Sequence, residues 1–281
     1  MWSPRTVQSY CINLDRRTDR WAHIQSIPEV QKIPNLQRVS AVDGGTIDIP
    51  TETRISTLCR YNIMNKTRRA HDMLDSAGGV GCALSHIQLW QQLLKSDQEV
   101  FLILEDDILI EDGDYDKICD MVERTPFLQD PTQWDIWTIG NIRCLEVPGV
   151  RPPGWDKKEN KWIQCREFLG MNTYFITRRA AERLLKEAFP IQHHIDWYIS
   201  FYARNHKDFV IHYNKMFNNK QIGVGGAGSD IQWRKQCHIC NIPSNVEDTH
   251  YYMRKENMHV IVLGALCVGV LAAYTVFRRQ K

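Results

Sequence analysis

The segment Val100–Asp107 reads VFLILEDD and says more about the fold than any other stretch of the chain. Five consecutive apolar residues bounded by polar ones predict a buried strand. Glu105, Asp106 and Asp107 follow it directly, so we expect them at the carboxyl edge of a sheet, where α/β proteins bind ligands. If the backbone stays extended, Glu105 and Asp107 face one side and Asp106 faces the other.

Strands and helices alternate on both sides of this segment. Strands are predicted at 7–14, 36–41, 135–139, 174–176 and 209–213, and helices at about 15–26, 82–94, 180–185 and 197–205. This alternation favours an α/β fold whose sheet is covered on both faces. Residues 46–78 show no clear periodicity, and we expect a functional loop or a mobile lid there. Residues 143–164 contain three prolines and are expected to form an irregular loop.

The composition is that of a globular protein. The 281 residues are 43% hydrophobic and 24% charged, which excludes disorder as a main theme. The formal net charge of +2 gives no reason to expect a nucleic-acid partner, because such binding needs a concentrated basic surface.

The C-terminal run HVIVLGALCVGVLAAYTVF, residues 259–277, predicts a single transmembrane helix. Nineteen residues rise roughly 28 Å as a helix, close to the thickness of a bilayer core. A buried core helix is the alternative. We therefore expect a catalytic domain at 7–235, a linker at 236–258 and a membrane anchor at 259–277. Because the chain opens without an apolar leader, the domain is expected to face the cytosol.

Nine cysteines, several of them inside apolar runs, favour reduced thiols in a reducing compartment over a disulfide framework. Cys237 and Cys240 form a lone C-x-x-C pair that His250 could extend to a poor zinc site. The sequon Asn65–Thr67 would matter only in a luminal region.

The acids after the central strand have a clear chemical use. Glu105 and Asp107 offer hard oxygen ligands that suit Mn²⁺ or Mg²⁺, which can then bridge to a diphosphate. The alternative is a solvated acidic turn that leads into the acids of 111–116.

The sequence resembles the family 25 glycosyltransferases, which include lipopolysaccharide sugar transferases and collagen galactosyltransferases. The matching segments, in order, are CINLDRRTDR (11–20), AVDG (41–44), GVGCALSHIQLW (79–90), FLILEDDILI (101–110), WDIWTIG (134–140), NTYFITRRAAERLL (172–185) and the Ile195–Asp196 pair. The resemblance implies a GT-A-type, Rossmann-like domain, a nucleotide-sugar donor and an acidic metal motif. It is thinner after Asp196 and does not include the apolar C-terminal run.

The resemblance also implies roles for particular residues. Glu105 and Asp107 would hold Mn²⁺ against the donor diphosphate, and Asp106 would reach the ribose or the sugar. The further donor contacts that it implies are Asn13 at the nucleotide, Arg16 or Arg20 at a phosphate, Asp43 at a nucleoside hydroxyl, and Ser85 and His86 near a glycine-rich helix start. The alternatives are a solvated helix face for the arginines and a core position for His86.

Because the family is described as inverting, a base must deprotonate the acceptor hydroxyl. Asp196 matches the family's acid at this point, and His194 is a weaker candidate. Asp196 could instead cap the helix that follows. His212 is a possible third metal ligand by chemistry alone, although a buried strand histidine is the commoner case.

The predicted reaction is metal-dependent transfer of galactose or glucose from a UDP-sugar to a hydroxyl of a glycan, a lipid-linked sugar or a protein. The main alternative is a catalytically silent, tail-anchored interaction protein that keeps the fold. A metal-dependent phosphotransferase or hydrolase of nucleotides is a third possibility. The sequence does not name the acceptor.

Overall fold

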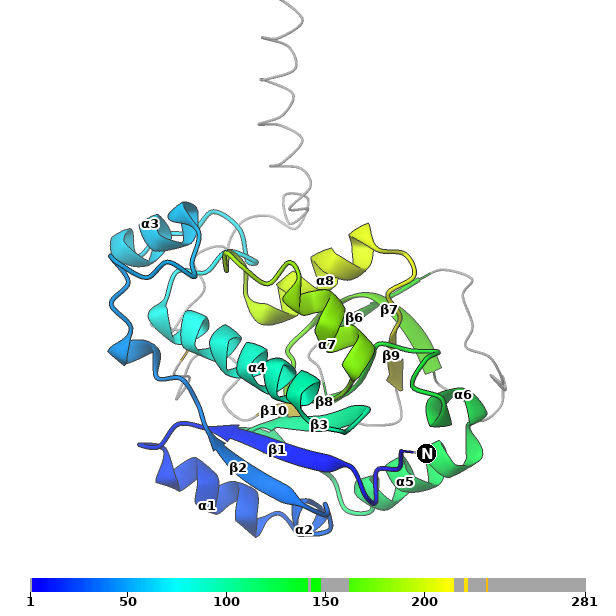
Figure 1. Cartoon of the computed structure of the whole chain (residues 1–281). Helices are drawn as coiled ribbons and strands as arrows, with labels where there is room; N and C mark the ends of the chain where they lie inside the picture. Colours follow the sequence, from blue (N-terminus) through cyan, green and yellow to red (C-terminus); the bar gives the residue numbers. More distant parts are fainter. Residues whose placement is uncertain (1, 141–142, 148–161, 215–219, 222–230, 232–281) are drawn as a thin grey trace, which may run out of the picture. The chain divides into compact units, whose positions relative to one another are not determined.

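A computed structural model describes residues 2–140, 143–147, 162–214, 220–221 and 231 (Figure 1). The chain divides into two compact units, one of residues 1–68 with 72–235 and the other of residues 69–71 with 236–281. Every helix and strand of the described residues belongs to the first unit.

An eight-stranded mixed sheet forms the centre of this unit, in the order β2-β1-β3-β8-β5-β9-β7-β6. β1 pairs in parallel with β2 and β3, and β5 with β9, whereas the other neighbours are antiparallel. The strands are β1 (Gln8–Asn13), β2 (Leu36–Ser40), β3 (Val100–Glu105), β5 (Ile136–Gly140), β6 (Arg143–Glu146), β7 (Trp162–Leu169), β8 (Thr173–Thr177) and β9 (Ile211–Asn214). A separate ribbon pairs β4 (Ile108–Leu109) with β10 (Lys220–Gln221).

Helices cover both faces of the sheet, as the sequence predicts (Figure 1). One face carries α4 (Ala77–Lys95), α7 (Arg178–Leu185) and α8 (Ile195–Asn205), and the other carries α1 (Thr18–Ser26), α2 (Pro28–Gln31), α5 (Asp114–Arg124) and α6 (Pro126–Gln129). Successive side chains of β3 point to opposite faces of the sheet and so contribute to two hydrophobic cores. Phe101 and Ile103 pack on the α4 side, whereas Leu102 and Leu104 pack on the opposite side.

The two segments predicted as loops contain regular structure. Within 46–78, α3 (Thr57–Asn65) begins at Ser56, whose Oγ accepts a hydrogen bond from the Cys59 N–H. This helix leaves Leu58, Tyr61 and Met64 exposed, so it carries no clean apolar face for the sequence to reveal. The segment 143–164 contains β6 and the start of β7.

The acidic stretch at 111–116 leads into α5. Asp114 and Asp116 lie in the first turn of this helix, where carboxylates favour the helix N-terminus. A run of acids that looks like a solvated turn therefore starts a helix.

Cys144 and Cys165 form a disulfide between β6 and β7, so the prediction of reduced thiols is wrong for this pair. It failed because their surroundings have the composition of an irregular loop and hide the strand pairing that brings the two together. Cys11, Cys59, Cys82 and Cys119 are free.

No helix among the described residues is long and apolar enough to span a bilayer. The predicted linker (236–258) and transmembrane helix (259–277) lie outside the described residues. Cys237, Cys240 and His250, which could form a poor zinc site, lie outside them too.

Candidate functional site

A cavity of about 780 Å³ opens at the carboxyl ends of β1 and β3. The chain passes from β1 to β2 on one side and later returns to β3 on the other, so the cavity lies at a topological switch point, where such sheets bind ligands. Its volume falls within the range of about 300–1,000 Å³ that small-molecule sites occupy. Eight of the residues predicted from the sequence line it: Arg16, Arg20, Asp43, Ser85, His86, Glu105, Asp106 and Asp107.

Glu105 and the two aspartates behind it reach different partners. The alternation of β3 carries Glu105 to the α4 side, where its Oε1 lies 3.3 Å from His86 Nε2. β3 ends at Glu105, and Asp106 and Asp107 form a turn in which both carboxylates approach Arg20 Nη1, at 2.8 and 3.5 Å. The predicted opposition of Asp106 to Asp107 assumed an extended backbone, and it fails because the strand has already ended.

Burial shapes the electrostatics of the His86–Glu105 pair. Burial, followed by the charges of Asp106 and Asp196, raises the pKa of Glu105 to about 8. Burial also lowers the pKa of His86 to about 4, against a smaller opposing effect of Asp196. His86 is therefore neutral at physiological pH, and the negative charges of Asp106 and Asp196 disfavour ionisation of Glu105.

Asn13 acts behind this acidic group rather than in the cavity. Its buried side chain donates to Asp106 Oδ2 at 2.6 Å and to the Arg17 carbonyl, and it accepts a hydrogen bond from Arg38 Nε at 2.7 Å. The predicted nucleotide contact is thus a residue that fixes the orientation of Asp106.

The turn at 41–45 forms the next wall of the cavity. Ser85 Oγ accepts a hydrogen bond from the Val42 N–H at 2.9 Å and donates to the Gly81 carbonyl at 2.7 Å, so it ties the turn to α4. Asp43 accepts a hydrogen bond from the Gly45 N–H at the start of the short 3-10 helix η1 (Gly44–Thr46), and its other oxygen lies 3.5 Å from Arg16.

Two glycines allow the turn at 41–45 to lie directly against α4. A Cβ on Gly44 would lie 2.1 Å from the Ala77 carbonyl oxygen, and one on Gly81 would lie 2.4 Å from the Val42 carbonyl oxygen. Neither backbone atom can move far, since one belongs to α4 and the other to the turn. The glycines therefore set how closely the turn carrying Asp43 approaches the helix.

The N-terminus of α4 also faces the cavity, through Ser76, Ala77 and Gly78. Ser76 is the N-cap, and its Oγ accepts a hydrogen bond from the Gly79 N–H. Unpaired N–H groups and the helix dipole make such an end favourable for an anion.

Asp196 does not line the cavity. It lies in the first turn of α8, where its Oδ2 accepts a hydrogen bond from the Gly170 N–H at 2.7 Å and its Oδ1 one from the Trp197 N–H at 2.8 Å. The N-cap of α8 is His194, so Asp196 is not the predicted cap. Burial raises the pKa of Asp196, and its charge acts on His86 and Glu105.

His212 occupies β9, 2% exposed, with its ring centroid 5.0 Å from that of Phe127. It is not part of the cavity, so the structure favours the buried strand histidine over a third metal ligand.

Sequence reasoning missed Cys82, which lines the cavity beside His86. The signal was present, because residues four apart in a helix lie on one face, and Cys82 and His86 have this spacing within α4. Lys66, at the end of α3, also lines the cavity.

His194 makes the fold sensitive to acid. Its Nε2 faces Arg68 Nη1 at 3.3 Å, and since a guanidinium only donates, this nitrogen must be unprotonated. Burial, helped by the charge of Arg68, lowers the pKa of His194 from 6.5 to about 4. As the pH falls from 6.5 to about 4, this histidine binds a proton in the unfolded chain but stays unprotonated in the folded chain. The free energy of unfolding therefore decreases over this pH range.

The variant His194→Gln tests this effect, because its amide oxygen still accepts a hydrogen bond but does not titrate. Between about pH 7 and pH 4.5, the unfolding free energy of the wild type should fall by about 2 kcal/mol more than that of the variant. Urea denaturation at both pH values measures the difference. Equal falls in the two proteins would contradict the assignment.

Comparison with known proteins identifies the family. A sequence model of glycosyltransferase family 25 (LPS biosynthesis protein) matches residues 6–199, more than half of the chain. The chain belongs to glycosyltransferase family 25. A family 25 member of Aedes aegypti is 24% identical over 264 residues, which cover 90% of this chain and 39% of the relative.

Two further relatives are similar over shorter stretches. A family 25 member of Anopheles gambiae is 26% identical over 63% of this chain and 28% of its own. Human procollagen galactosyltransferase 2 is 27% identical over 48% of this chain and 20% of its own. The family 25 chain described here thus spans less than two-fifths of the length of these relatives. The family model, over residues 6–199, includes every residue that lines the cavity except Ile231.

Proposed function

We propose that this family 25 chain is a metal-dependent, inverting glycosyltransferase of the GT-A type that transfers galactose or glucose from a UDP-sugar. The observation that carries the proposal is the cavity at the switch point, where three consecutive acids, two arginines and a helix N-terminus face one space. In a nucleotide sugar with a metal-bound diphosphate, the metal cation would suit the acids, and the phosphates would suit the arginines and the helix N-terminus. The acceptor is a hydroxyl of a glycan, a lipid-linked sugar or a protein, the last in keeping with the procollagen galactosyltransferase among the relatives.

The residues present fit a divalent cation. Glu105 and Asp107 offer the hard oxygen ligands that Mn²⁺ and Mg²⁺ prefer. Burial, followed by the charges of Asp106 and Asp196, raises the pKa of Glu105, and a bound cation would favour its ionised form. When bound, the metal would neutralise charge on the departing nucleoside diphosphate.

The donor's phosphates would lie against the N-terminus of α4 and the guanidinium of Arg16. Arg20 pairs with Asp106 and Asp107 and so holds both carboxylates in place at the cavity. Asp43 would accept a hydrogen bond from a nucleoside hydroxyl. These contacts fix the donor in the orientation that attack at the anomeric carbon requires.

Asp196 is the proposed base, and its raised pKa makes it a better proton acceptor than an exposed aspartate. Asp196→Asn should lower kcat for transfer at least about 100-fold and leave the donor's KM near that of the wild type. Initial-rate kinetics with a thermal melt on the same sample separates this from a folding defect. An unchanged kcat in a folded variant would mean that Asp196 only holds the backbone, through its hydrogen bonds with the Gly170 and Trp197 N–H groups.

Metal removal tests the reaction class. We expect the purified chain to release UDP from one nucleotide sugar of a panel when Mn²⁺ is present, and EDTA to abolish this release until Mn²⁺ is restored. Donor binding without UDP release, measured by thermal stabilisation, would favour the catalytically silent alternative. Phosphate release from free nucleotide would favour a hydrolase.

The membrane anchor at 259–277 and a cytosolic orientation of the domain also stay proposals. The full chain should resist carbonate extraction, and a chain ending near residue 257 should not. The Cys144–Cys165 disulfide counts against a cytosolic orientation, because disulfides persist in oxidising compartments. Use of the sequon at Asn65, which lies exposed at the end of α3, would reveal a luminal domain.

A further inference from the structure

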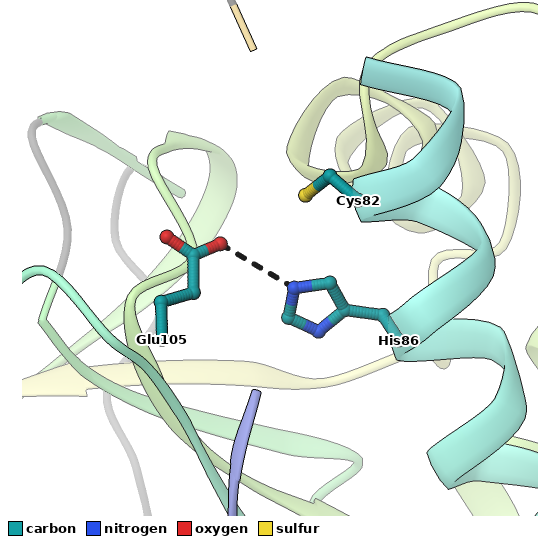
Figure 2. A group of neighbouring side chains, drawn as sticks. All are labelled: Cys82, His86 and Glu105. Atoms are coloured by element: carbon teal, nitrogen blue, oxygen red, sulfur yellow. Dashed lines mark hydrogen bonds and ion pairs between the residues drawn. The ribbon is translucent and has the colours of Figure 1, made fainter. Parts of the chain in front are cut away.

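Cys82, His86 and Glu105 form a group on the wall of the cavity that the proposed transfer reaction does not explain (Figure 2). One ligand atom from each, the Cys82 Sγ, a ring nitrogen of His86 and a carboxylate oxygen of Glu105, lies within 4.8 Å of the other two. Two residues come from one face of α4 and the third from the end of β3, so the fold itself brings them together.

The chemistry of this group differs from that of the acids alone. A thiol and an imidazole are ligands that zinc selects, whereas Mn²⁺ and Mg²⁺ prefer oxygen. Zinc binds sulfur at about 2.3 Å and nitrogen at about 2.0 Å, so ligands on one tetrahedral ion lie roughly 3.5 Å apart. His86 Nε2 and Glu105 Oε1 are already 3.3 Å apart.

His86 is held in the orientation that a ligand needs. Its Nδ1 lies 2.8 Å from the Tyr174 hydroxyl, which also accepts a hydrogen bond from Trp90 Nε1 at 3.1 Å. These buried partners direct Nε2 towards Glu105. Metal-bound histidines typically use such a contact on the second nitrogen.

We propose that Cys82, His86 and Glu105 bind one zinc-class cation, with an open coordination position towards the cavity. Three protein ligands and a free fourth position are the arrangement of reactive rather than purely structural zinc sites. All three residues line the cavity, so water or a phosphate oxygen can occupy that position. Binding displaces the proton of the Cys82 thiol, and any proton on the Glu105 carboxyl, to solvent.

Cys82 separates this site from the proposed Mn²⁺ site. Glu105 is common to both, but only the zinc site uses sulfur, so a Cys82 variant tests the zinc site whatever the fate of the transfer reaction. The test uses Co²⁺, which replaces zinc and shows a near-ultraviolet charge-transfer band when a thiolate binds it.

The experiment starts from the full chain with Cys237→Ser and Cys240→Ser, which removes the C-x-x-C pair as a competing thiol site. We expect this protein to bind one equivalent of Co²⁺ with the thiolate band, and zinc to displace it. Adding Cys82→Ser should abolish the band and weaken zinc binding at least about 100-fold, since losing even an outer partner of a ligand costs about 10- to 100-fold. Cys59→Ser, at a buried free cysteine outside the cavity, is the matched control and should retain the band.

The proposal is overturned if the band is absent once Cys237 and Cys240 are replaced, or if it survives Cys82→Ser. A thermal melt accompanies each measurement. Should Cys82→Ser not fold, Cys82→Ala removes the same ligand without adding a hydroxyl to the helix.

Discussion

Replacing Asp107 with asparagine should lower Mn²⁺-dependent UDP release at least about 100-fold in a protein that melts close to the wild type. The substitution keeps the shape of the side chain but removes a negative charge that the proposed site uses to hold the cation. Removing one group that stabilises transition-state charge typically costs about 100- to 1,000-fold. Arg20 keeps its shorter contact with Asp106, so the fold at this turn should survive.

Asp97→Asn is the matched control, because it makes the same charge change at an exposed position just before β3. Its rate of UDP release should equal that of the wild type. If Asp107→Asn released UDP at the wild-type rate and needed Mn²⁺ as before, Asp107 would not be a metal ligand.

Asp135→Ala should lower the free energy of unfolding by about 3 kcal/mol, the largest effect on stability that we expect from a single substitution. Asp135 is fully buried before β5, where both its oxygens accept hydrogen bonds from Arg179 at 3.1 Å and Oδ2 accepts another from the Val210 N–H at 2.8 Å. It thus joins α7 and the residue just before β9 to the start of β5. Breaking a buried pair by removing one partner costs about 3–5 kcal/mol, and the exposed part of Arg179 places this case at the low end.

Urea denaturation measures the effect. The control is Asp208→Asn, which breaks the surface contact of Asp208 with Arg183 and should leave the denaturation midpoint close to that of the wild type. A midpoint for Asp135→Ala as high as that of the control would show that the buried carboxylate does not stabilise the fold.

Most of the sheet was predictable, because its signals are local. The apolar run at 100–104 can only be a buried strand, and its alternation placed Glu105 on the α4 side. The switch point lies where β1 is flanked by β2 on one side and β3 on the other. Eight of the predicted residues line the one cavity at this point. The helix α3 and the β6–β7 pairing left weaker signals. The apolar residues of α3 are partly exposed and form no clear stripe, and the pairing of Cys144 with Cys165 depends on strand contacts that the local sequence does not show.

The site was harder to predict wherever a side chain acts through another. Asn13 sits at the end of β1, where a ligand contact is expected, yet it turns inward to fix Asp106. Arg20 matches a phosphate contact by position, but it also pairs with both aspartates. Only coordinates distinguish a group that faces a ligand from one that faces another side chain.

The close approach of Gly44 and Gly81 gives a simple criterion for surveys of distant family members. A relative with side chains at both positions could not bring the turn this near the helix, because each Cβ would overlap a carbonyl oxygen. Its cavity would have to be wider on that side. The residues at these two positions therefore indicate, from sequence alone, which relatives share this pocket shape and which have evolved another.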